Sequence, residues 1–424
     1  MCLKALKVSK FFVFIFVFGC TQQPARTLKV LTFRDRQSSA LRQALPQFEA
    51  ENSVRVQLDD IPGSSVATKM MTDLAAGGTY DVYALDEPFI PQFHDKLLPT
   101  PLWPELTTES LSGFEGKALR AAEFEGIRVG LPVNGNVYQY IFRKDMFNNP
   151  KEQKDFEKRF NRKLTPPQNF SELLEIAQHF YRPPLMYGFA PFTKMSEGTT
   201  VELLWLLAGF GYTPGEKNIP LTTVAKALNF YEQLLATAPK SARAWHHTER
   251  MSAYAKGRVA QMMTWNSFFF DLEDEFKSLV VGKTGYTRSP GSTATSLAGS
   301  WVASIRKGSP ETALASRFIQ WWTSSKLTTQ LVPKGLSTAR SDVLTEPQLN
   351  SQFPWLNTTH LNFERAFLRP RHLDYRKTSD QLSQSFTRWI AGQLDTRQAS
   401  EALHNALIDM NRLAAGRIDQ RRAN

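Results

Sequence analysis

The stretch VATKMMTDLAAGGTYDVYALDE, residues 66–87, joins an amphipathic segment directly to a short apolar one. Apolar residues recur at helical spacing as far as Gly77 and Gly78, which are typical of a helix C-terminus. The apolar run at 80–85 then has the length and composition of a buried strand. A helix followed at once by a strand is the repeating unit of an α/β fold.

The residues before this stretch extend the same alternation. LKVLTF at 28–33 indicates a strand, a polar loop is expected at 34–40, and the amphipathic segment at 41–51 indicates a helix. VRVQLDD at 54–60 alternates as a half-buried strand does. The resulting order of strand, helix, strand, helix and strand predicts a parallel sheet covered by helices.

The rest of the chain is predicted to mix helices with short strands. Residues 126–147 indicate two strands around Pro132 and the turn signal at Asn134 and Gly135. Helices are expected at 169–181 with Ser171 or Asn169 as N-cap, at 200–212, at 222–239 with Thr222 or Thr223 as N-cap, at 310–324, and at 380–413 with a break near Gly392 and Asp395. A strand is expected at 300–305.

The first 20 residues predict export. Eight apolar residues at 11–18 follow three lysines, whereas a membrane-spanning helix needs about 20 apolar residues. Residues 1–19 therefore indicate a signal peptide. Residues 17–20 resemble a bacterial lipobox, which predicts a lipidated Cys20 and a tether over 20–27. The alternative is a plain secretion signal in which Cys20 is incidental.

The length, cysteine content and charge of the chain limit the functions that it can have. The length of 424 residues predicts two or three domains. The only cysteines are Cys2 and Cys20, so the mature body has no cysteine for a disulfide or a thiolate nucleophile. The leader holds three of the 51 basic and none of the 40 acidic residues, which leaves a net charge of +8. The densest basic segment, 143–163, is interleaved with acids as in a solvated helix, and no nucleic-acid partner is expected.

No catalytic or metal pattern emerges. His246, His247 and Glu249 lack the i, i+4 histidine spacing of a zinc helix. Adjacent acids at 59–60, 86–87 and 274–275 do not define the geometry of two carboxyls flanking a glycosidic bond. We therefore expect no catalytic residues, no metal and no cofactor.

Several motifs occur in an order that resembles a known family. Residues 48–98 are similar to a helix, a Gly-x-x-Asp-Val strand, an acidic loop and a closing Leu-Pro segment of the family 1 extracellular solute-binding proteins of ABC transporters, the maltodextrin-binding class. Further similar motifs follow at 126–147, 165–180, 203–235, 253–265, 298–324 and 397–411. The resemblance covers nearly the whole mature chain. The sequence departs from the family pattern at Phe33, Phe170 and Ser300.

The resemblance implies a periplasmic-binding-protein-like α/β fold of type II, with two lobes, a ligand cleft and a hinge of crossing strands. It implies crossings near 132–135, 290–292 and 335–340. Lobe 1 is expected to comprise residues 28–133 and 292–335, and lobe 2 residues 134–291 and 336–424.

The resemblance also implies a function: a monomeric, lipid-anchored protein of the cell envelope, facing the periplasm or cell exterior, that hands a carbohydrate to an ABC permease. By position on the motifs, the expected ligand-binding residues are Asp35, Arg36, Asp86, Glu87, Asn134, Tyr138, Trp265 and Trp301. Three alternatives stay open: a receptor for another solute such as a sugar phosphate, an envelope sensor or scaffold without transport, and a secreted glycosidase.

Overall fold

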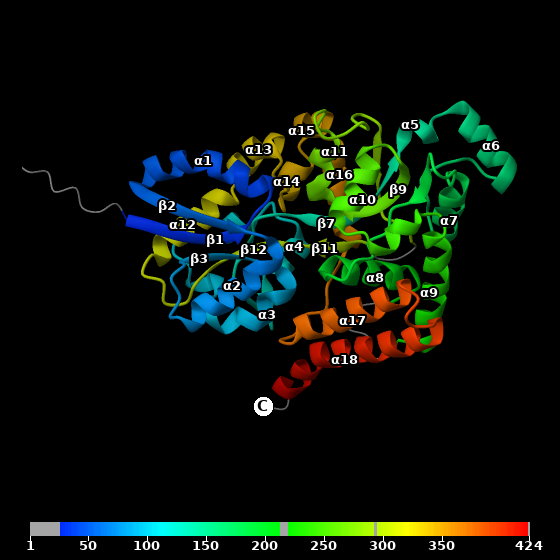
Figure 1. The fold of residues 1–424 in the computed structure, drawn as a ribbon. Coiled ribbons are helices and arrows are strands. Elements are labelled where there is room, and N and C mark those ends of the chain that lie inside the picture. Colours follow the sequence, from blue (N-terminus) through cyan, green and yellow to red (C-terminus); the bar gives the residue numbers. More distant parts are fainter. Residues whose placement is uncertain (1–25, 213–218, 292–294, 423–424) are drawn as a thin grey trace, which may run out of the picture.

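The computed structural model describes residues 26–212, 219–291 and 295–422, with side chains as far as Leu413. The predicted signal peptide, Cys20 and most of the tether lie outside the described residues. Two lobes stand side by side, each built on its own sheet (Figure 1). This arrangement confirms the predicted two-lobed α/β fold.

The first sheet has the strand order β2-β1-β3-β12-β6. Strands β1 (Arg26–Phe33), β2 (Val54–Ile61) and β3 (Val82–Asp86) are parallel, as predicted. Strand β12 (Trp301–Ile305) runs antiparallel to β3 and to β6 (Leu131–Pro132). Helices α1 (Arg36–Asn52), α2 (Gly63–Ala75) and α12 (Thr312–Trp322) pack on this sheet, and together they form the first lobe.

The polar loop predicted at 34–40 is mostly helix. Helix α1 begins at Arg36 because the carboxylate of Asp35 accepts hydrogen bonds from the backbone N–H groups of Gln37 and Ser38. This N-cap satisfies donors that have no partner within the helix, so the helix extends into a segment with few apolar residues.

The second sheet has the order β13-β11-β7-β9-β8, and β10 also pairs with β7. Its strands are β7 (Asn136–Arg143), β8 (Tyr187–Phe189), β9 (Val259–Trp265), β10 (Thr284–Thr287), β11 (Leu297–Gly299) and β13 (Phe367–Leu368). Strand β7 is antiparallel to β9, β10 and β11. A small hairpin of β4 (Glu123–Phe124) and β5 (Ile127–Arg128) stands apart from both sheets.

Four long helices complete the second lobe: α8 (Glu197–Gly209), α9 (Leu221–Leu235), α17 (Tyr375–Ile390) and α18 (Thr396–Arg422) (Figure 1). Helix α8 is apolar around most of its circumference and is correspondingly buried. The chain breaks between α17 and α18 where Gly392 has a φ of +74°, as the sequence predicted. Asn169, one of the two predicted candidates, is the N-cap of α7 (Phe170–His179). Pro220, and neither predicted threonine, precedes α9.

The other α-helices are α3 (Ile90–Phe93), α4 (Gly116–Ala121), α5 (Lys144–Phe147), α6 (Pro150–Phe160), α7 (Phe170–His179), α10 (His247–Ala255), α11 (Phe269–Leu272), α13 (Ser325–Leu331), α14 (Ser341–Leu344), α15 (Pro347–Gln352) and α16 (Trp355–Arg365). The 3₁₀ turns are η1 (Glu87–Phe89), η2 (His94–Lys96), η3 (Thr100–Leu102), η4 (Glu109–Leu111), η5 (Lys240–Ala244), η6 (Asn266–Phe268) and η7 (Val332–Lys334). None of the helices in the described part of the chain is long and apolar enough to cross a bilayer.

The chain passes between the two sheets at two strand junctions. It leaves the first sheet between β6 and β7, through Val133 to Gly135, and it returns between β11 and β12, at Ser300. The return predicted near 290–292 is therefore too early. Residues 297–299 still pair with β7 and β13 of the second sheet, and this three-residue strand gave no periodic signal of its own.

A third passage packs against the first of these crossings. The backbone N–H of Gly135 donates to the carbonyl of Ser337, within the predicted crossing at 335–340. A Cβ at Gly135 would meet the carbonyl oxygen of Thr338 at 2.2 Å, so only glycine allows the two crossing segments to approach this closely.

Candidate functional site

A cavity of about 580 Å³ lies between the two lobes. The first lobe contributes the ends of β1 and β3, the start of α2 and the first residue of β12, and the second lobe contributes the end of β9 and the starts of α8, α10 and α17. The volume is within the range of small-molecule sites, which are usually concave and lined by aromatic groups with a few polar ones. Its aromatic lining consists of Phe33, Phe89, Phe192, His246, His247, Trp265, Phe268 and Trp301.

Trp301 stands on the first-lobe wall. As the first residue of β12 it follows the crossing at Ser300, and its indole packs on the ring of Phe33 with centroids 4.1 Å apart. A Cβ at Gly63 would lie 3.1 Å from the indole, so that glycine leaves room for the ring. The backbone N–H of Trp301 donates to the Oδ1 of Asn134 at 2.8 Å. The ring is held on one side and partly exposed on the other.

Trp265 stands on the second-lobe wall, at the end of β9. Its ring meets that of Tyr138 edge-on, with centroids 5.3 Å apart. A Cβ at Gly299 would lie 2.8 Å from the indole, so the bare backbone of β11 supports the ring. Each indole therefore packs against a glycine and presents its free surface to the cavity.

Tyr138 belongs to a fully buried polar cluster beneath this wall. Its hydroxyl donates to the carboxylate of Glu202 and accepts from Arg250 at 3.0 Å, and Tyr231 donates to the same carboxylate at 2.8 Å. Burial raises the pKa of Glu202, and the positive charge of Arg250 opposes that shift. The cluster fixes the tyrosine, which in turn fixes the position of Trp265.

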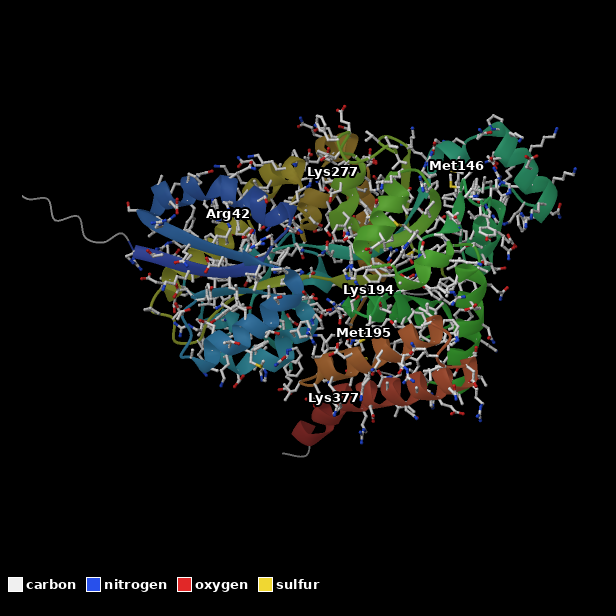
Figure 2. All side chains as sticks on the ribbon, viewed as in Figure 1. Arg42, Met146, Lys194, Met195, Lys277 and Lys377 are labelled. Carbon is white, nitrogen blue, oxygen red and sulfur yellow. The ribbon has the colours of Figure 1, made fainter. Side chains whose placement is uncertain are left out.

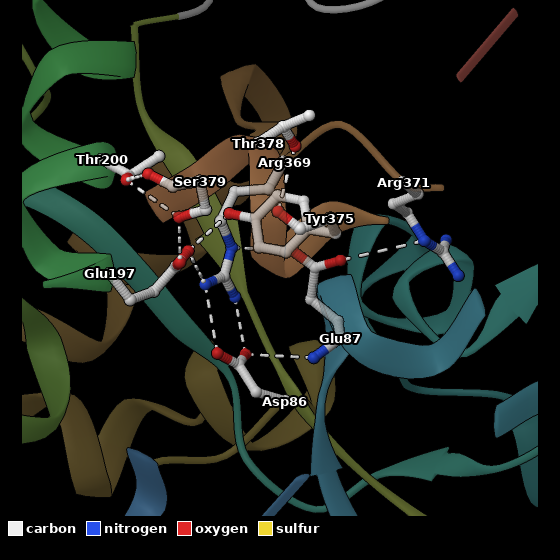
Figure 3. Close-up of polar contacts among 9 residues, drawn as sticks. All are labelled: Asp86, Glu87, Glu197, Thr200, Arg369, Arg371, Tyr375, Thr378 and Ser379. Atoms are coloured by element: carbon white, nitrogen blue, oxygen red, sulfur yellow. Dashed lines mark hydrogen bonds and ion pairs between the residues drawn. The ribbon is translucent and has the colours of Figure 1, made fainter. Parts of the chain in front are cut away.

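Arg369, which directly follows β13, connects the two lobes at the cavity (Figure 3). Only 3% of its side chain is exposed, and the guanidinium donates to Asp86 at 2.6 and 3.1 Å, to Glu87 at 3.0 Å and to Glu197 at 2.9 Å. Asp86 ends β3 of the first lobe and Glu87 follows it, whereas Glu197 begins α8 of the second lobe. Such bidentate pairs are geometrically specific and stronger than neutral hydrogen bonds.

The three carboxylates differ in exposure. Glu87 is fully buried, and burial raises its pKa to about 7 against the opposing charges of Arg369 and Arg371. Asp86 and Glu197 are 19% and 31% exposed, and both line the cavity. Glu197 also accepts hydrogen bonds from Tyr375 and Ser379 (Figure 3). The arrangement leaves oxygen atoms of two rigidly held carboxylates beside the cavity.

Asp35 and His247 add polar groups from opposite walls. Burial raises the pKa of Asp35 to about 6, although hydrogen bonds from Ser38 and Gln37 oppose this shift. Burial and the nearby Arg250 lower the pKa of His247 to about 3, so its imidazole is neutral at physiological pH. The ring of His247 packs on Phe268 with centroids 3.6 Å apart. In the described part of the chain, no three His, Cys, Asp or Glu residues are placed to hold a metal ion.

The structure brings four of the eight predicted residues to the cavity: Asp35, Asp86, Trp265 and Trp301. Arg36 instead forms ion pairs with Asp271 and Asp274 of the second lobe, at 2.6 and 3.1 Å. Glu87, Asn134 and Tyr138 are buried behind the cavity lining and position its residues. The structure places these four residues outside the cavity lining, where they link the lobes or support the wall.

The sequence did not lead us to expect Arg369 or Glu197 at the cavity. Arg369 lies in ERAFLRPRHL, residues 364–373, which contains three arginines and a strand of only two residues. No periodicity distinguishes the inward-facing arginine from its neighbours. Glu197 is the first residue of an apolar helix and has the sequence signature of an ordinary acidic first turn.

Comparisons with known proteins agree with this geometry. A family model for bacterial extracellular solute-binding proteins matches residues 43–354. A probable amino-acid ABC transporter periplasmic-binding protein of Sinorhizobium fredii is 24% identical over 231 residues, which cover 53% of this chain and 51% of that protein. The match thus spans about half the length of that relative.

Solved structures show the same fold. A solute-binding protein from Agrobacterium radiobacter K84 in complex with ribitol has a TM-score of 0.78 and 21% identity, with 92% of this chain and 98% of that chain covered. Maltose-bound MalE3 of T. maritima also has a TM-score of 0.78 and 21% identity, with 90% and 99% covered. A third, from Agrobacterium vitis S4 with bound D-mannitol, has a TM-score of 0.74, 17% identity, and 93% and 99% covered.

Proposed function

Because this chain belongs to the family of bacterial extracellular solute-binding proteins, we propose that it captures a small neutral carbohydrate or polyol between its lobes and delivers it to the transmembrane subunits of an ABC importer. The observation that carries the proposal is the pair of indoles, Trp265 and Trp301, on opposite walls of one cavity that also contains fixed carboxylates.

The lining has the chemistry that sugar recognition needs. The C–H faces of a sugar ring pack well on an indole, and carboxylates accept hydrogen bonds from hydroxyl groups. The oxygen atoms of Asp86 and Glu197 keep acceptor capacity beyond the hydrogen bonds they already receive from Arg369. We propose that Asp35, Asp86, Glu197 and Arg369 orient the hydroxyls while the indoles enclose the ring.

The same network argues against a charged ligand such as an amino acid or a sugar phosphate. An amino acid would need a carboxylate for its ammonium group and a cation for its own carboxylate. Arg369 is already compensated by Asp86, Glu87 and Glu197, so its charge is not available to bind an anion. The bound ribitol, maltose and D-mannitol of the similar structures support the choice of a neutral ligand.

We propose that ligand binding closes the lobes about the crossings at 133–135, 300 and 335–340. A ligand that touches both walls binds the closed state more tightly than the open one, and this difference shifts the population. Small-angle scattering at saturating ligand should show a smaller radius of gyration than without ligand. An unchanged radius contradicts closure.

The experiment that tests the function is a thermal-shift screen of sugars, polyols and amino acids, followed by calorimetric titration of each hit. A ligand at 100 times its Kd stabilises the folded protein by about 2.7 kcal/mol, which a melting curve resolves. Recovery of unchanged ligand separates binding from hydrolysis. Stabilisation by amino acids and by no sugar or polyol overturns the proposal, and cleavage of a chromogenic glycoside favours a glycosidase.

We further propose that residues 1–19 are removed, that Cys20 is lipidated, and that the monomeric protein faces the periplasm or cell exterior. The lysines and short apolar run of the leader support this part of the proposal. Cys20→Ser should release the folded protein from membranes and abolish labelling by radioactive palmitate. Equal membrane retention of the variant contradicts lipid anchoring.

A further inference from the structure

Three large apolar side chains are exposed close together on residues 273–283, the loop between α11 and β10, which we call the Phe276 loop. Phe276 is 98% exposed, Leu279 71% and Val281 38%. Single exposed apolar residues are ordinary on a protein surface, whereas a group of them marks contact with another molecule. Figure 2 shows Lys277 of this loop at the top of the molecule, near the boundary between the lobes.

The Phe276 loop is fixed to the second lobe by backbone hydrogen bonds. The backbone N–H of Phe276 donates to the carboxylate of Asp274 at 3.1 Å. The backbone N–H of Leu279 donates to the carbonyl of Ala255 at 2.8 Å. Val280, which lies between exposed residues, is 1% exposed and packs in the core of the second lobe. The exposed side chains therefore stand on an ordered support, and a partner that covers them has to order little of the loop.

An arginine of the first lobe reaches the same segment. Arg36 donates to the carboxylate of Asp271 at 2.6 Å and to that of Asp274 at 3.1 Å. Asp274 also accepts the hydrogen bond from the backbone of Phe276. One carboxylate thus contacts both the first lobe and the loop that carries the exposed ring, so both lobes hold the loop in place.

The segments that meet at this ion pair also line the ligand cavity. Asp35, which lines the cavity, directly precedes Arg36, and Phe268, which lines it from the other lobe, directly precedes α11. A partner that receives the ligand has to contact both lobes beside the cavity. The Phe276 loop is an apolar surface in a position that meets this requirement.

The charges of the segment indicate the chemistry of the partner. Residues 271–283 contain four acidic residues and two lysines: Asp271, Glu273, Asp274, Glu275, Lys277 and Lys283. An anionic bilayer attracts basic segments instead. A second copy of the chain in a two-fold symmetric contact would bring two acidic segments together. The loop therefore fits an apolar protein surface that is bordered by basic groups.

We propose that the Phe276 loop is a docking surface for the transmembrane subunits of the importer, with Phe276 and Leu279 entering an apolar pocket on a part of those subunits outside the bilayer. This inference rests on the proposed function and adds the surface by which the partner recognises the chain. Because Arg36 of the first lobe holds the segment that carries the loop, a change in the arrangement of the lobes acts directly on this surface.

The test compares uptake with affinity for the sugar identified in the screen. Phe276→Ser/Leu279→Ser removes the two most exposed apolar side chains of the loop and changes no charge. Leu102→Ser/Leu185→Ser is the matched control, because it removes two apolar side chains that are 63% and 80% exposed and do not line the cavity. Each variant replaces the wild-type chain in the cells that produce it, where uptake of radiolabelled sugar is measured. The purified chains are titrated by calorimetry.

We expect the loop variant to bind the sugar within twofold of wild type and to lower uptake at least tenfold at limiting sugar. The control variant should match wild type in both measurements. Wild-type uptake in the loop variant, an equal fall in both variants, or a loss of affinity that accounts for the loss of uptake overturns the docking surface and leaves the proposed function standing.

A photocrosslinking amino acid in place of Phe276 identifies the partner in the same cells. We expect a crosslink to a transmembrane subunit of an ABC importer. Crosslinks only to lipid or only to a second copy of the chain overturn the docking surface. Binding of no sugar or polyol in the wider screen overturns the proposed function, and the docking surface with it.

Discussion

The guanidinium of Arg369 forms two hydrogen bonds with the carboxylate of Asp86, from Nη2 to Oδ1 at 2.6 Å and from Nη1 to Oδ2 at 3.1 Å. One partner follows the last strand of the second sheet and the other ends the third strand of the first. The pair therefore joins the two lobes at the edge of the cavity, and its arginine also holds Glu87 and Glu197.

Arg369→Met should destabilise the ligand-free protein by about 3–5 kcal/mol, because it removes the cation of the partly buried Asp86 and Glu197 and leaves the fully buried Glu87 with only Arg371, at 3.9 Å. Urea unfolding at pH 7 measures this loss. Arg376→Met on the same face of the cavity removes a cation that is 54% exposed and should change stability by less than about 1 kcal/mol. Similar losses in both variants would contradict the buried role of Arg369.

Trp265→Ala and Trp301→Ala should each weaken binding of the sugar identified in the screen by about 2 kcal/mol or more, roughly thirtyfold, because each removes an aromatic surface from the cavity. Trp321→Ala is the control, since Trp321 packs on Phe48 of the first lobe and does not line the cavity. It should lower the melting temperature and leave affinity intact. Unchanged affinity in both cavity variants would refute the site.

Gly299→Ala should displace Trp265, because the new Cβ would lie 2.8 Å from the indole and 3.5 Å from Nη2 of Arg369. We expect affinity to fall about tenfold, as a ring shifted by a few tenths of an ångström loses its fit to the sugar. Tryptophan fluorescence reports the displacement, and calorimetry the affinity. Gly116→Ala is the control, since no atom lies within 4 Å of its added Cβ, and it should leave both readouts unchanged.

The sequence was enough to predict those strands and helices in which a periodic pattern of apolar residues extends over the whole element. Strands β1 to β3 and helix α2 were predicted because alternation and helical spacing persist for a whole element, and the order of these elements implies the parallel sheet. The cavity tryptophans were predicted because Trp265 ends one recognisable strand motif, at 259–265, and Trp301 begins another, at 301–305.

The other elements and site residues depend on contacts between segments that lie far apart in the sequence. Strand β11 has only three residues and is defined by its pairing with β7 and β13, so its motif carried no local signal and the return crossing was placed too early. Tyr138 was expected in the cleft by position, but its neighbours Glu202 and Arg250 draw it into a buried cluster. The importance of Arg369 follows from three acids that lie far from it in the chain.

The partly buried carboxyl of Asp35 predicts a specific dependence of stability on pH. Its pKa rises from 3.8 to about 6 in the folded protein, mainly because of burial, so between about pH 4 and 6 the folded state binds more protons than the unfolded state. The stabilising contribution of Asp35 is therefore fully present below pH 4 and is lost as the pH rises through 6. The total change is about 3 kcal/mol at most.

Asp35→Asn should remove this dependence, because asparagine caps a helix about as well as aspartate but carries no titrating proton. Urea unfolding of both proteins at pH 4, 5, 6 and 7 should show the variant gaining stability relative to wild type across this range. Asp155→Asn, on the exposed face of α6, serves as control and should run parallel to wild type. If the Asp35→Asn curve also stays parallel to wild type, the carboxyl titrates in the folded protein as it does in the unfolded chain, and its burial beside the cavity has no electrostatic consequence.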